Sequence, residues 1–155
     1  MNSYVKLTTL FAIILFTQTA CASAPNFSDV RDKDWKLMEV RAGTNSVIFQ
    51  RSMVTQESIK DFYTLRFDAE RVNGAGYPNR YFAPYALAEK QAINIQPIAS
   101  TLMLAMSEPE QLKEREFFSY LEKTDQWNLV KGNLELRSKN NEGAAVVLVF
   151  SSGNL

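Results

Sequence analysis

Apolar and polar residues alternate along most of the chain from Trp35 onward, which is typical of strands buried on one face. In the clearest case Tyr63, Leu65 and Phe67 alternate with polar residues. The run from Trp35 to Val40 alternates as well, although a helical turn would also fit its spacing. Further strands are predicted around 47–49, 85–87, 93–95, 127–129, 134–136 and 146–150.

One helix is predicted within this β pattern, from about Glu108 to Glu122. Ser107 and Glu110 have the spacing of a capping box, and Pro109 would lie in the first turn, where its missing N–H is not needed. Helical spacing groups the apolar side chains Phe117, Phe118 and Leu121. Together the elements predict an α+β fold, in which a small, mostly antiparallel, curved or barrel-like sheet packs against one helix.

Two carboxylates, Glu110 and Glu114, fall on the apolar side of this predicted helix. Because a buried unpaired charge is costly, we expect Glu114 to accept hydrogen bonds and tie the helix to the sheet. The candidate donors are backbone N–H groups and the side chains of Asn79, Arg80, Ser100 and Thr101. An acid or base role beside Asp68 or Glu70 is the weaker interpretation. Nothing in the sequence sets the carboxyl separation of roughly 5 to 9.5 Å that such hydrolysis needs.

Two glycines, Gly74 and Gly76, lie two residues apart after the strand that contains Phe67. In a strand, this spacing indicates a bulge or a close approach of another backbone segment. A hairpin turn at Asn73–Gly74 is the alternative.

The stretch GYPNRYFAPY, residues 76–85, concentrates aromatic residues and prolines. Its structural interpretation is a tight corner between two strands, with Pro78 and Pro84 fixing backbone angles. Tyr81, Phe82 and Tyr85 would then cover the edge of the core. In the functional interpretation, a cleft binds a small hydrophobic or glycan ligand, because such pockets combine aromatic faces with a few fixed polar groups. The residues of that cleft would be Asn79, Arg80, Tyr81 and Tyr85.

The composition narrows the classes of function. Basic and acidic residues both number 17, so we expect no nucleic-acid partner. The chain contains no histidine, which excludes imidazole-based hydrolase sites and the usual zinc sites. The single cysteine, Cys21, excludes an internal disulfide. We therefore expect no enzyme activity, no metal and no cofactor.

The N-terminal segment has the three parts of a secretory signal. Lys6 precedes an apolar run from Leu7 to Phe16, which is too short for a membrane span, and small residues follow. Thr19-Ala20-Cys21 resembles the bacterial lipobox, although Gln18 departs from its pattern. Lipidation of Cys21 is therefore predicted. Ordinary cleavage after Ala22 or Ala24 is the alternative.

These signals divide the chain into a lipoprotein signal peptide (1–21), a polar spacer (22–34) and one domain (35–151). The residue after Cys21 is not aspartate, and by analogy with Gram-negative lipoproteins this indicates an outer-membrane anchor. We expect a lipid-anchored protein that faces the periplasm, or alternatively a soluble periplasmic one.

The domain resembles the META domain, the HslJ-like family of small envelope proteins, over about residues 35–151. The matching pieces are W-x-L at 35–37, LRFDAERVNGAG at 65–76, NRYF at 79–82, PIAST at 97–101, E-x-x-F-F-x-x-L at 114–121 and the closing L-x-L and LVF. The resemblance implies a non-enzymatic role in envelope maintenance or stress tolerance, through protein or surface contacts. Relatives carry a cysteine where this chain has Pro78 and a second one near Leu104–Met106. A disulfide or redox role implied for them is excluded here.

Overall fold

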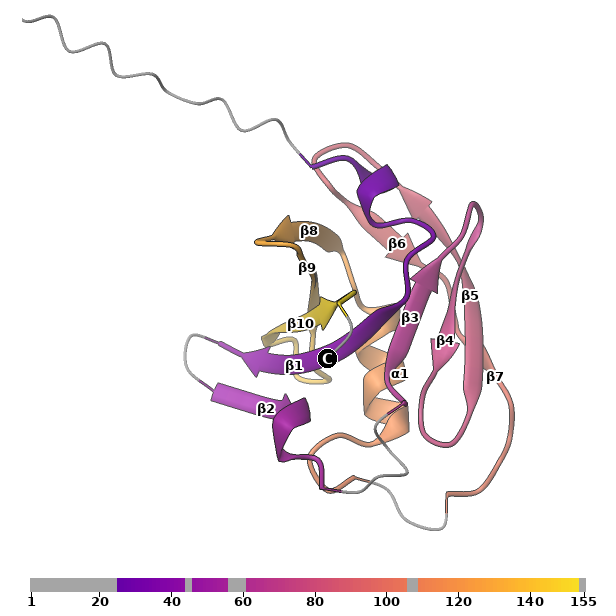
Figure 1. Ribbon diagram of the computed structural model, residues 1–155, viewed down its shortest axis with the longest axis vertical. Helices are drawn as coiled ribbons and strands as arrows, with labels where there is room; N and C mark the ends of the chain where they lie inside the picture. Colours follow the sequence, from indigo (N-terminus) through magenta and orange to yellow (C-terminus); the bar gives the residue numbers. More distant parts are fainter. Residues whose placement is uncertain (1–24, 44–45, 56–60, 106–108, 154–155) are drawn as a thin grey trace, which may run out of the picture.

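The computed structural model describes residues 25–43, 46–55, 61–105 and 109–153 (Figure 1). The predicted signal peptide, its cleavage sites and Cys21 lie outside these residues, as do Ser107 and Glu108 of the predicted capping box.

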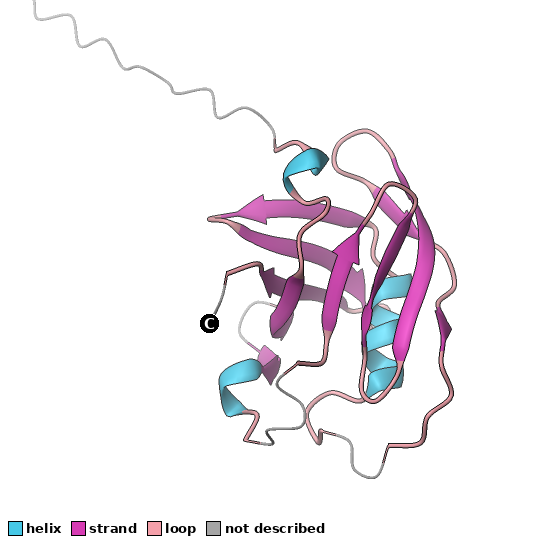
Figure 2. Cartoon of the chain, turned by 45° about the vertical axis from the view of Figure 1, so that its right-hand side comes forward, coloured by secondary structure: helices cyan, strands magenta, loops and turns pink. Residues whose placement is uncertain are grey.

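The described residues form ten antiparallel strands that curve into a nearly closed barrel (Figures 1 and 2). The strands are β1 (Trp35–Ala42), β2 (Ser46–Gln50), β3 (Thr64–Phe67), β4 (Arg71–Ala75), β5 (Arg80–Leu87), β6 (Ile93–Ile95), β7 (Ala99–Ser100), β8 (Gln126–Val130), β9 (Asn133–Lys139) and β10 (Ala145–Ser151). Their order is β6-β5-β4-β3-β1-β10-β9-β8, with β2 paired to β1 and β7 paired to β5. A bridge between Ala92 and Gln126 brings the two ends of this order together.

Within the described residues the helical segments are the 3-10 turns η1 (Phe27–Asp29) and η2 (Arg51–Met53) and the α-helix α1 (Glu114–Glu122). α1 buries Phe117, Tyr120 and Leu121. Its Tyr120 carbonyl accepts a hydrogen bond of 2.6 Å from the Ser138 hydroxyl of β9. The predicted α+β class, with a barrel-like antiparallel sheet and one packed α-helix, is therefore confirmed.

The α-helix starts later than the sequence pattern predicted. It begins at Glu114 after Lys113, so Glu110 is an exposed residue outside the helix, and its predicted place on the helical apolar face is wrong. The segment before the helix serves tertiary contacts instead. Leu112 is buried, and its carbonyl accepts a 2.7 Å hydrogen bond from the Tyr63 hydroxyl.

A bulge changes which residues of β1 face the core. The register against β10 shifts between Leu37 and Glu39, so Trp35, Leu37 and Val40 are buried. Simple alternation would have placed Glu39 on the buried face. The segment is nevertheless a strand throughout, and the helical-turn alternative is wrong.

Gly74 marks a close approach of two backbones. It lies inside β4, paired with Tyr81 of β5, and a Cβ atom built there would be 2.0 Å from the Thr64 carbonyl oxygen. The hairpin-turn alternative at Asn73–Gly74 is therefore wrong. The turn that leads into β4 lies earlier, where the Asp68 carboxylate accepts hydrogen bonds from the backbone N–H groups of Glu70 and Arg71.

The segment interpreted as a spacer contributes to the core. Phe27 is buried, and its ring centroid is 5.2 Å from that of Phe67 and 5.0 Å from that of Trp127. Val30 is also buried, and its carbonyl accepts a 2.9 Å hydrogen bond from the Trp35 indole. The packed domain thus begins before residue 35, and the described part of the predicted spacer is corrected accordingly.

Candidate functional site

The corner between β4 and β5 is the centre of the predicted site. A 2.7 Å hydrogen bond from the Gly76 N–H to the Asn79 carbonyl closes it, and the Tyr77–Pro78 peptide is cis. The ladder resumes at once with the pair Ala75 and Arg80. Pro84 does not belong to this corner, because it lies within β5 opposite Arg71.

Asn79 has every donor and acceptor of its side-chain amide occupied. Its Nδ2 group donates to Glu114 Oε2 at 2.7 Å and to the Met103 carbonyl at 3.2 Å. Its Oδ1 atom accepts from the Met103 N–H at 2.7 Å and from the Thr101 hydroxyl at 2.8 Å. An amide offers two donors and one oxygen with two lone pairs, so Asn79 has no capacity left for a ligand.

Glu114 joins the start of α1 to the same corner. Its Oε1 atom accepts a 2.7 Å hydrogen bond from the Asn79 backbone N–H, beside the side-chain bond to Oε2. Gly76 leaves the room for this contact, since a Cβ atom there would be 2.6 Å from Glu114 Oε1 and 2.8 Å from the Phe118 ring. The Glu114 carboxylate thus ties the helix to the corner, and Asn79 in turn bonds Thr101 and Met103.

The two tyrosines of the predicted cleft, Tyr81 and Tyr85, lie in β5 and point into the fold. Tyr81 is buried and donates to the Thr64 carbonyl at 2.8 Å, and burial raises the pKa of its hydroxyl. Tyr85 donates to the Asp68 carbonyl at 2.7 Å, and burial raises its pKa as well. Phe82 lies on the opposite face of β5 and is partly exposed, with the Arg71 guanidinium 5.6 Å from its ring centroid. Arg80 is exposed.

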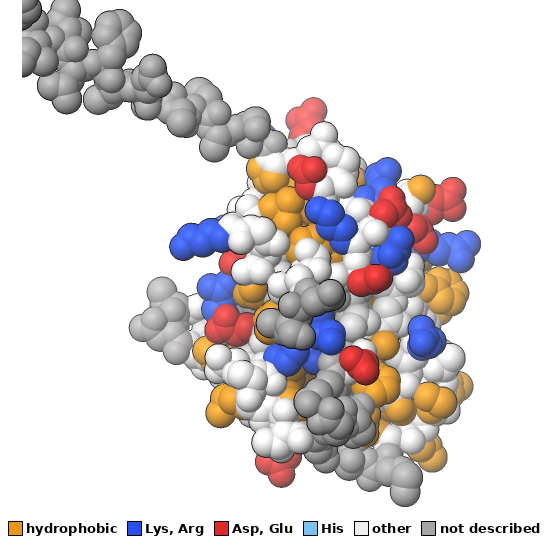
Figure 3. Space-filling view, viewed as in Figure 1, with side chains coloured by type: hydrophobic (Ala, Val, Ile, Leu, Met, Phe, Trp, Pro, Cys, Tyr) orange, Lys and Arg blue, Asp and Glu red, His pale blue; other side chains and the backbone are white. Residues whose placement is uncertain are grey.

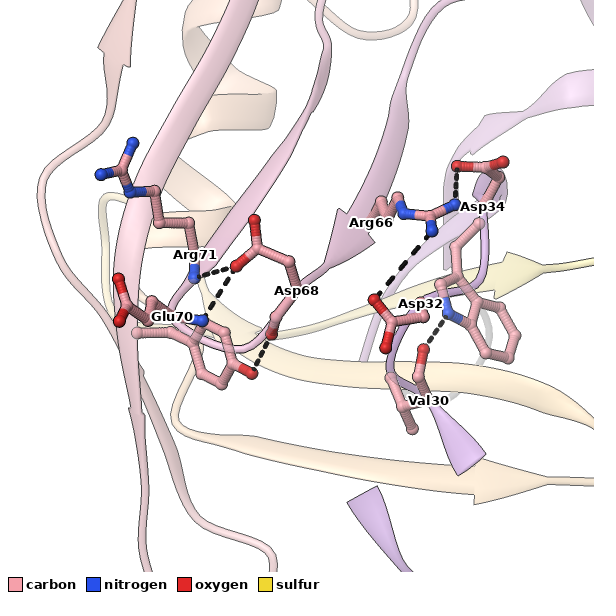
Figure 4. A network of polar contacts seen from close by, with 9 residues as sticks. Val30, Asp32, Asp34, Arg66, Asp68, Glu70 and Arg71 are labelled. Atoms are coloured by element: carbon pink, nitrogen blue, oxygen red, sulfur yellow. Dashed lines mark hydrogen bonds and ion pairs between the residues drawn. The ribbon is translucent and has the colours of Figure 1, made fainter. Parts of the chain in front are cut away.

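The carboxylates considered for paired chemistry are not brought together. Asp68 and Glu70 precede β4 (Figure 4). Glu114 instead lies at Gly76, just after the end of β4. Five residues of strand separate the two positions, which corresponds to roughly 16 Å. The hydrogen bonds from Glu70 and Arg71 lower the pKa of Asp68. They stabilise a turn.

A second polar cluster, which the sequence patterns did not indicate, holds the N-terminal segment against β3. Arg66 contacts Asp34 at 3.3 Å and Asp32 at 4.0 Å (Figure 4). Close by, the Asp32 N–H donates to the Phe67 carbonyl at 2.8 Å. Both aspartates are exposed, so these ion pairs contribute little, and the backbone hydrogen bond positions the segment.

Three open hollows lie on the surface of the described residues. One hollow of about 650 Å³ lies beside α1 and is lined by residues that include Ile98, Arg115, Phe118 and Glu122. Two others, of about 610 and 670 Å³, lie beside β1 and over β8–β10. None of these three is lined by Asn79, Arg80, Tyr81 or Tyr85.

The described residues contain neither a candidate metal site nor a candidate membrane span. No group of three or more acidic or cysteine side chains is placed to hold a metal ion in this part of the chain. Within the same residues, no helix has the length and apolar content needed to cross a membrane.

A family comparison identifies the domain. The family model described as META domain matches residues 28–152. The chain belongs to the META domain family. The META match begins at Ser28, within η1, and so includes most of the N-terminal segment that packs on the core.

Solved structures share the fold of this META domain at low sequence identity. A protein from Burkholderia xenovorans, solved by NMR, is 14% identical with a TM-score of 0.56, and the match covers 99% of this chain and 100% of that one. A DUF4847 family protein from Bacteroides vulgatus, known from a crystal structure, is 11% identical with a TM-score of 0.57, and the match covers 83% and 98%. No curated protein matches the chain.

Proposed function

We propose that this META-domain protein is a non-enzymatic lipoprotein of the bacterial cell envelope. Cys21 anchors it in the outer membrane, facing the periplasm, and its surface contacts envelope proteins in a role of envelope maintenance or stress tolerance. The N-terminal pattern of charge, apolar run and small residues supports export, and the position of Cys21 supports lipidation. No cofactor and no nucleic acid takes part.

The saturated Asn79 amide is the observation that carries the non-enzymatic part of this proposal. Asn79, Glu114 and Tyr81 would be the natural chemical groups of the corner, and each is used in hydrogen bonds within the domain. Groups that are buried and fully bonded serve the stability of a fold. The function of the protein then depends on the envelope proteins that its outer surface contacts.

The anchor is tested on the protein made with its own leader in a Gram-negative host. We expect the mature product to start at Cys21, to have the mass of an acylated chain and to partition into detergent. The Cys21→Ser variant is the control and should partition into water. A wild-type product that starts at Ser23 or Pro25 and stays in water would contradict the anchor.

The surface-contact role is tested by proximity labelling in the native envelope. A labelling enzyme fused to the C-terminus should mark a small set of envelope proteins repeatedly. The same fusion on an unrelated outer-membrane lipoprotein provides the background. Identical labelling by both fusions would contradict a specific contact.

The alternative function, a small hydrophobic or glycan ligand at the Asn79 to Tyr85 corner, has less support. The Tyr81 and Tyr85 hydroxyls both donate to backbone carbonyls of the fold, and the Asn79 amide is saturated. A rise in melting temperature with envelope lipids or glycans, lost in Arg80→Ala, would favour it over the first proposal.

A further inference from the structure

The segment Ala99–Ala105, named here the strap, continues the sheet beyond its last assigned strand. β7 pairs with β5, and the Thr101 N–H donates to the Arg80 carbonyl at 3.1 Å. Asn79 then bonds both the N–H and the carbonyl of Met103, at 2.7 and 3.2 Å. These are the two bonds that a backbone partner makes across a ladder. The side chain of Asn79 thus replaces a strand residue and holds the strap in line with β7.

The strap presents an open edge. Because the backbone groups of Thr101 and Met103 point toward β5, strand alternation directs those of Ser100, Leu102 and Leu104 the other way. Among the described residues, no hydrogen bond involves the backbone of Leu102 or Leu104. β7 and the following segment lie at the outer edge of the molecule in both ribbon views (Figures 1 and 2).

The side chains along this edge are apolar and exposed. Leu102 and Leu104 are 96% and 95% exposed, Met103 is 57% exposed, and Phe82 on the neighbouring β5 is 46% exposed. Figure 3 shows apolar side chains gathered on the lower right of the molecule. Removing apolar side chains from water is favourable, so the strap favours a contact that covers it.

The edge also lacks the usual protection against pairing. Exposed edge strands normally carry lysine, proline, a bulge or an inward-pointing charge. From Gln91 to Ser107 the sequence contains no charged residue, and Pro97 lies before β7 rather than within the strap. The two hydrogen bonds to Asn79 keep Met103 in place, so the two leucines are held outward on an ordered backbone.

We propose that the strap pairs edge to edge with the strap of a second copy of this chain, in an antiparallel dimer with two-fold symmetry. A two-fold axis at Leu102 pairs this residue with Leu102 of the second copy, and Ser100 with Leu104 of the second copy. Each such pair exchanges two N–H···O bonds. The arrangement uses the same surface twice, as a two-fold interface requires.

The absence of charge favours a second copy as the occupant, and the size of the contact sets the affinity. The strap has no charge, so two copies meet without the repulsion that a charged edge would create. The contact consists of one short edge and four large apolar side chains per copy, which places it near or below the ~1,200 Å² lower bound of stable interfaces. We therefore expect a dimer that forms with a dissociation constant on the order of micromolar and depends on concentration.

Sedimentation velocity tests the dimer on the processed chain of the Cys21→Ser variant, which needs no detergent. Over roughly 1 to 200 µM, a range chosen to span that constant, the sedimentation coefficient should rise from monomer to dimer. Leu102→Lys should remain monomeric, because two lysines would face each other at the axis. Leu102→Glu should remain monomeric for the same reason.

Mixing the two charged variants provides the decisive readout. Lysine in one copy faces glutamate in the other, so the mixture should dimerise although neither variant does so alone. Val47→Lys, at an apolar residue of β2 that is 49% exposed, is the matched control and should dimerise like the wild type. Circular dichroism should show the same fold for every variant.

Two outcomes would overturn the proposal. A wild type that stays monomeric over the whole range excludes self-pairing of the strap, and a dimer that persists in Leu102→Lys excludes it as well. If the wild type is monomeric, binds vesicles of phosphatidylethanolamine and phosphatidylglycerol, and loses this binding in Leu102→Lys, the strap is a lipid contact instead. None of these outcomes bears on the anchor at Cys21.

Discussion

The two oxygens of Glu114 accept hydrogen bonds from two groups of one residue, the backbone N–H and the side-chain amide of Asn79, both at 2.7 Å. The two residues are 35 positions apart in sequence. The contact fixes where α1 begins relative to the corner between β4 and β5. It also positions Asn79 to hold Met103.

Replacing Glu114 with alanine should destabilise the domain by about 2 to 4 kcal/mol. The change leaves two donors of Asn79 without an acceptor, and hydrogen bonds to charged groups contribute about 1.5 to 3 kcal/mol each. Urea denaturation followed by tryptophan fluorescence measures the effect. Glu110→Ala is the matched control, since Glu110 is exposed and outside the helix, and its effect should stay within ~0.5 kcal/mol. Equal effects of the two variants would contradict this role of Glu114.

Gly74→Ala should cost more than Gly76→Ala. At Gly74 the added methyl group meets the Thr64 carbonyl at 2.0 Å, and the backbone must move. At Gly76 it meets the side chains of Glu114 and Phe118, which can shift in part. We expect a loss of about 3 kcal/mol or more at Gly74 and about 1 to 3 kcal/mol at Gly76. Gly153→Ala, with no atom nearer than 3.8 Å, should be neutral in the same thermal melts. The reverse order would show that β3 and β4 lie farther apart in solution.

Tyr81 should make the domain sensitive to alkali. Burial raises the pKa of its hydroxyl in the folded state, so the neutral form is favoured there. This contribution to stability is complete below the ordinary tyrosine pKa of ~10 and is lost as the pH rises above it. Tyr81→Phe should lower stability at pH 8 by about 1 kcal/mol, because the bond to the Thr64 carbonyl is lost. The free energy of unfolding of this variant should then fall less steeply between pH 9 and 11. An unchanged slope would contradict the assignment.

Phe27→Ala should destabilise the domain by about 3 to 5 kcal/mol, the range for a buried phenylalanine. Its ring contacts Phe67 and Trp127, so the near-ultraviolet circular dichroism of the tryptophan should change as well. Phe82→Ala is the matched control, because Phe82 is 46% exposed, and it should cost about 1 kcal/mol or less in dilute solution. A neutral Phe27→Ala would mean that the segment before Trp35 is a spacer after all.

The sequence predicted the strands in which burial of one face requires an apolar residue at every second position. Leu65 and Phe67 alternate with polar residues because β3 is buried on one face, and Tyr63, which directly precedes β3, is buried as well. The start of the helix was missed for a physical reason. The capping-box pattern at 107–110 is a local signal, whereas Leu112 is held in the core by a bond from Tyr63, 49 residues away.

For the candidate site, the sequence predicted several possible donors to the Glu114 carboxylate and could not select one of them. A carboxylate on the apolar side of a helix needs a donor, which pointed to Asn79 among several residues, but no spacing rule selects one partner 35 residues away. Phe27 gave no signal because a single aromatic residue in a polar segment has no period. The uncharged run from Gln91 to Ser107 was visible, yet its meaning depends on the outward direction of Leu102 and Leu104.

Because the Phe27 ring packs in the core, it limits the distance between the barrel and the proposed lipid anchor at Cys21. Only six positions separate Phe27 from Cys21, which corresponds to an extended reach of roughly 20 Å. If Cys21 carries lipid as proposed, the barrel stays within this reach of the membrane and keeps its η1 end toward the bilayer. Such a protein cannot diffuse through the periplasm, so the envelope proteins that it contacts must reach the inner surface of the outer membrane.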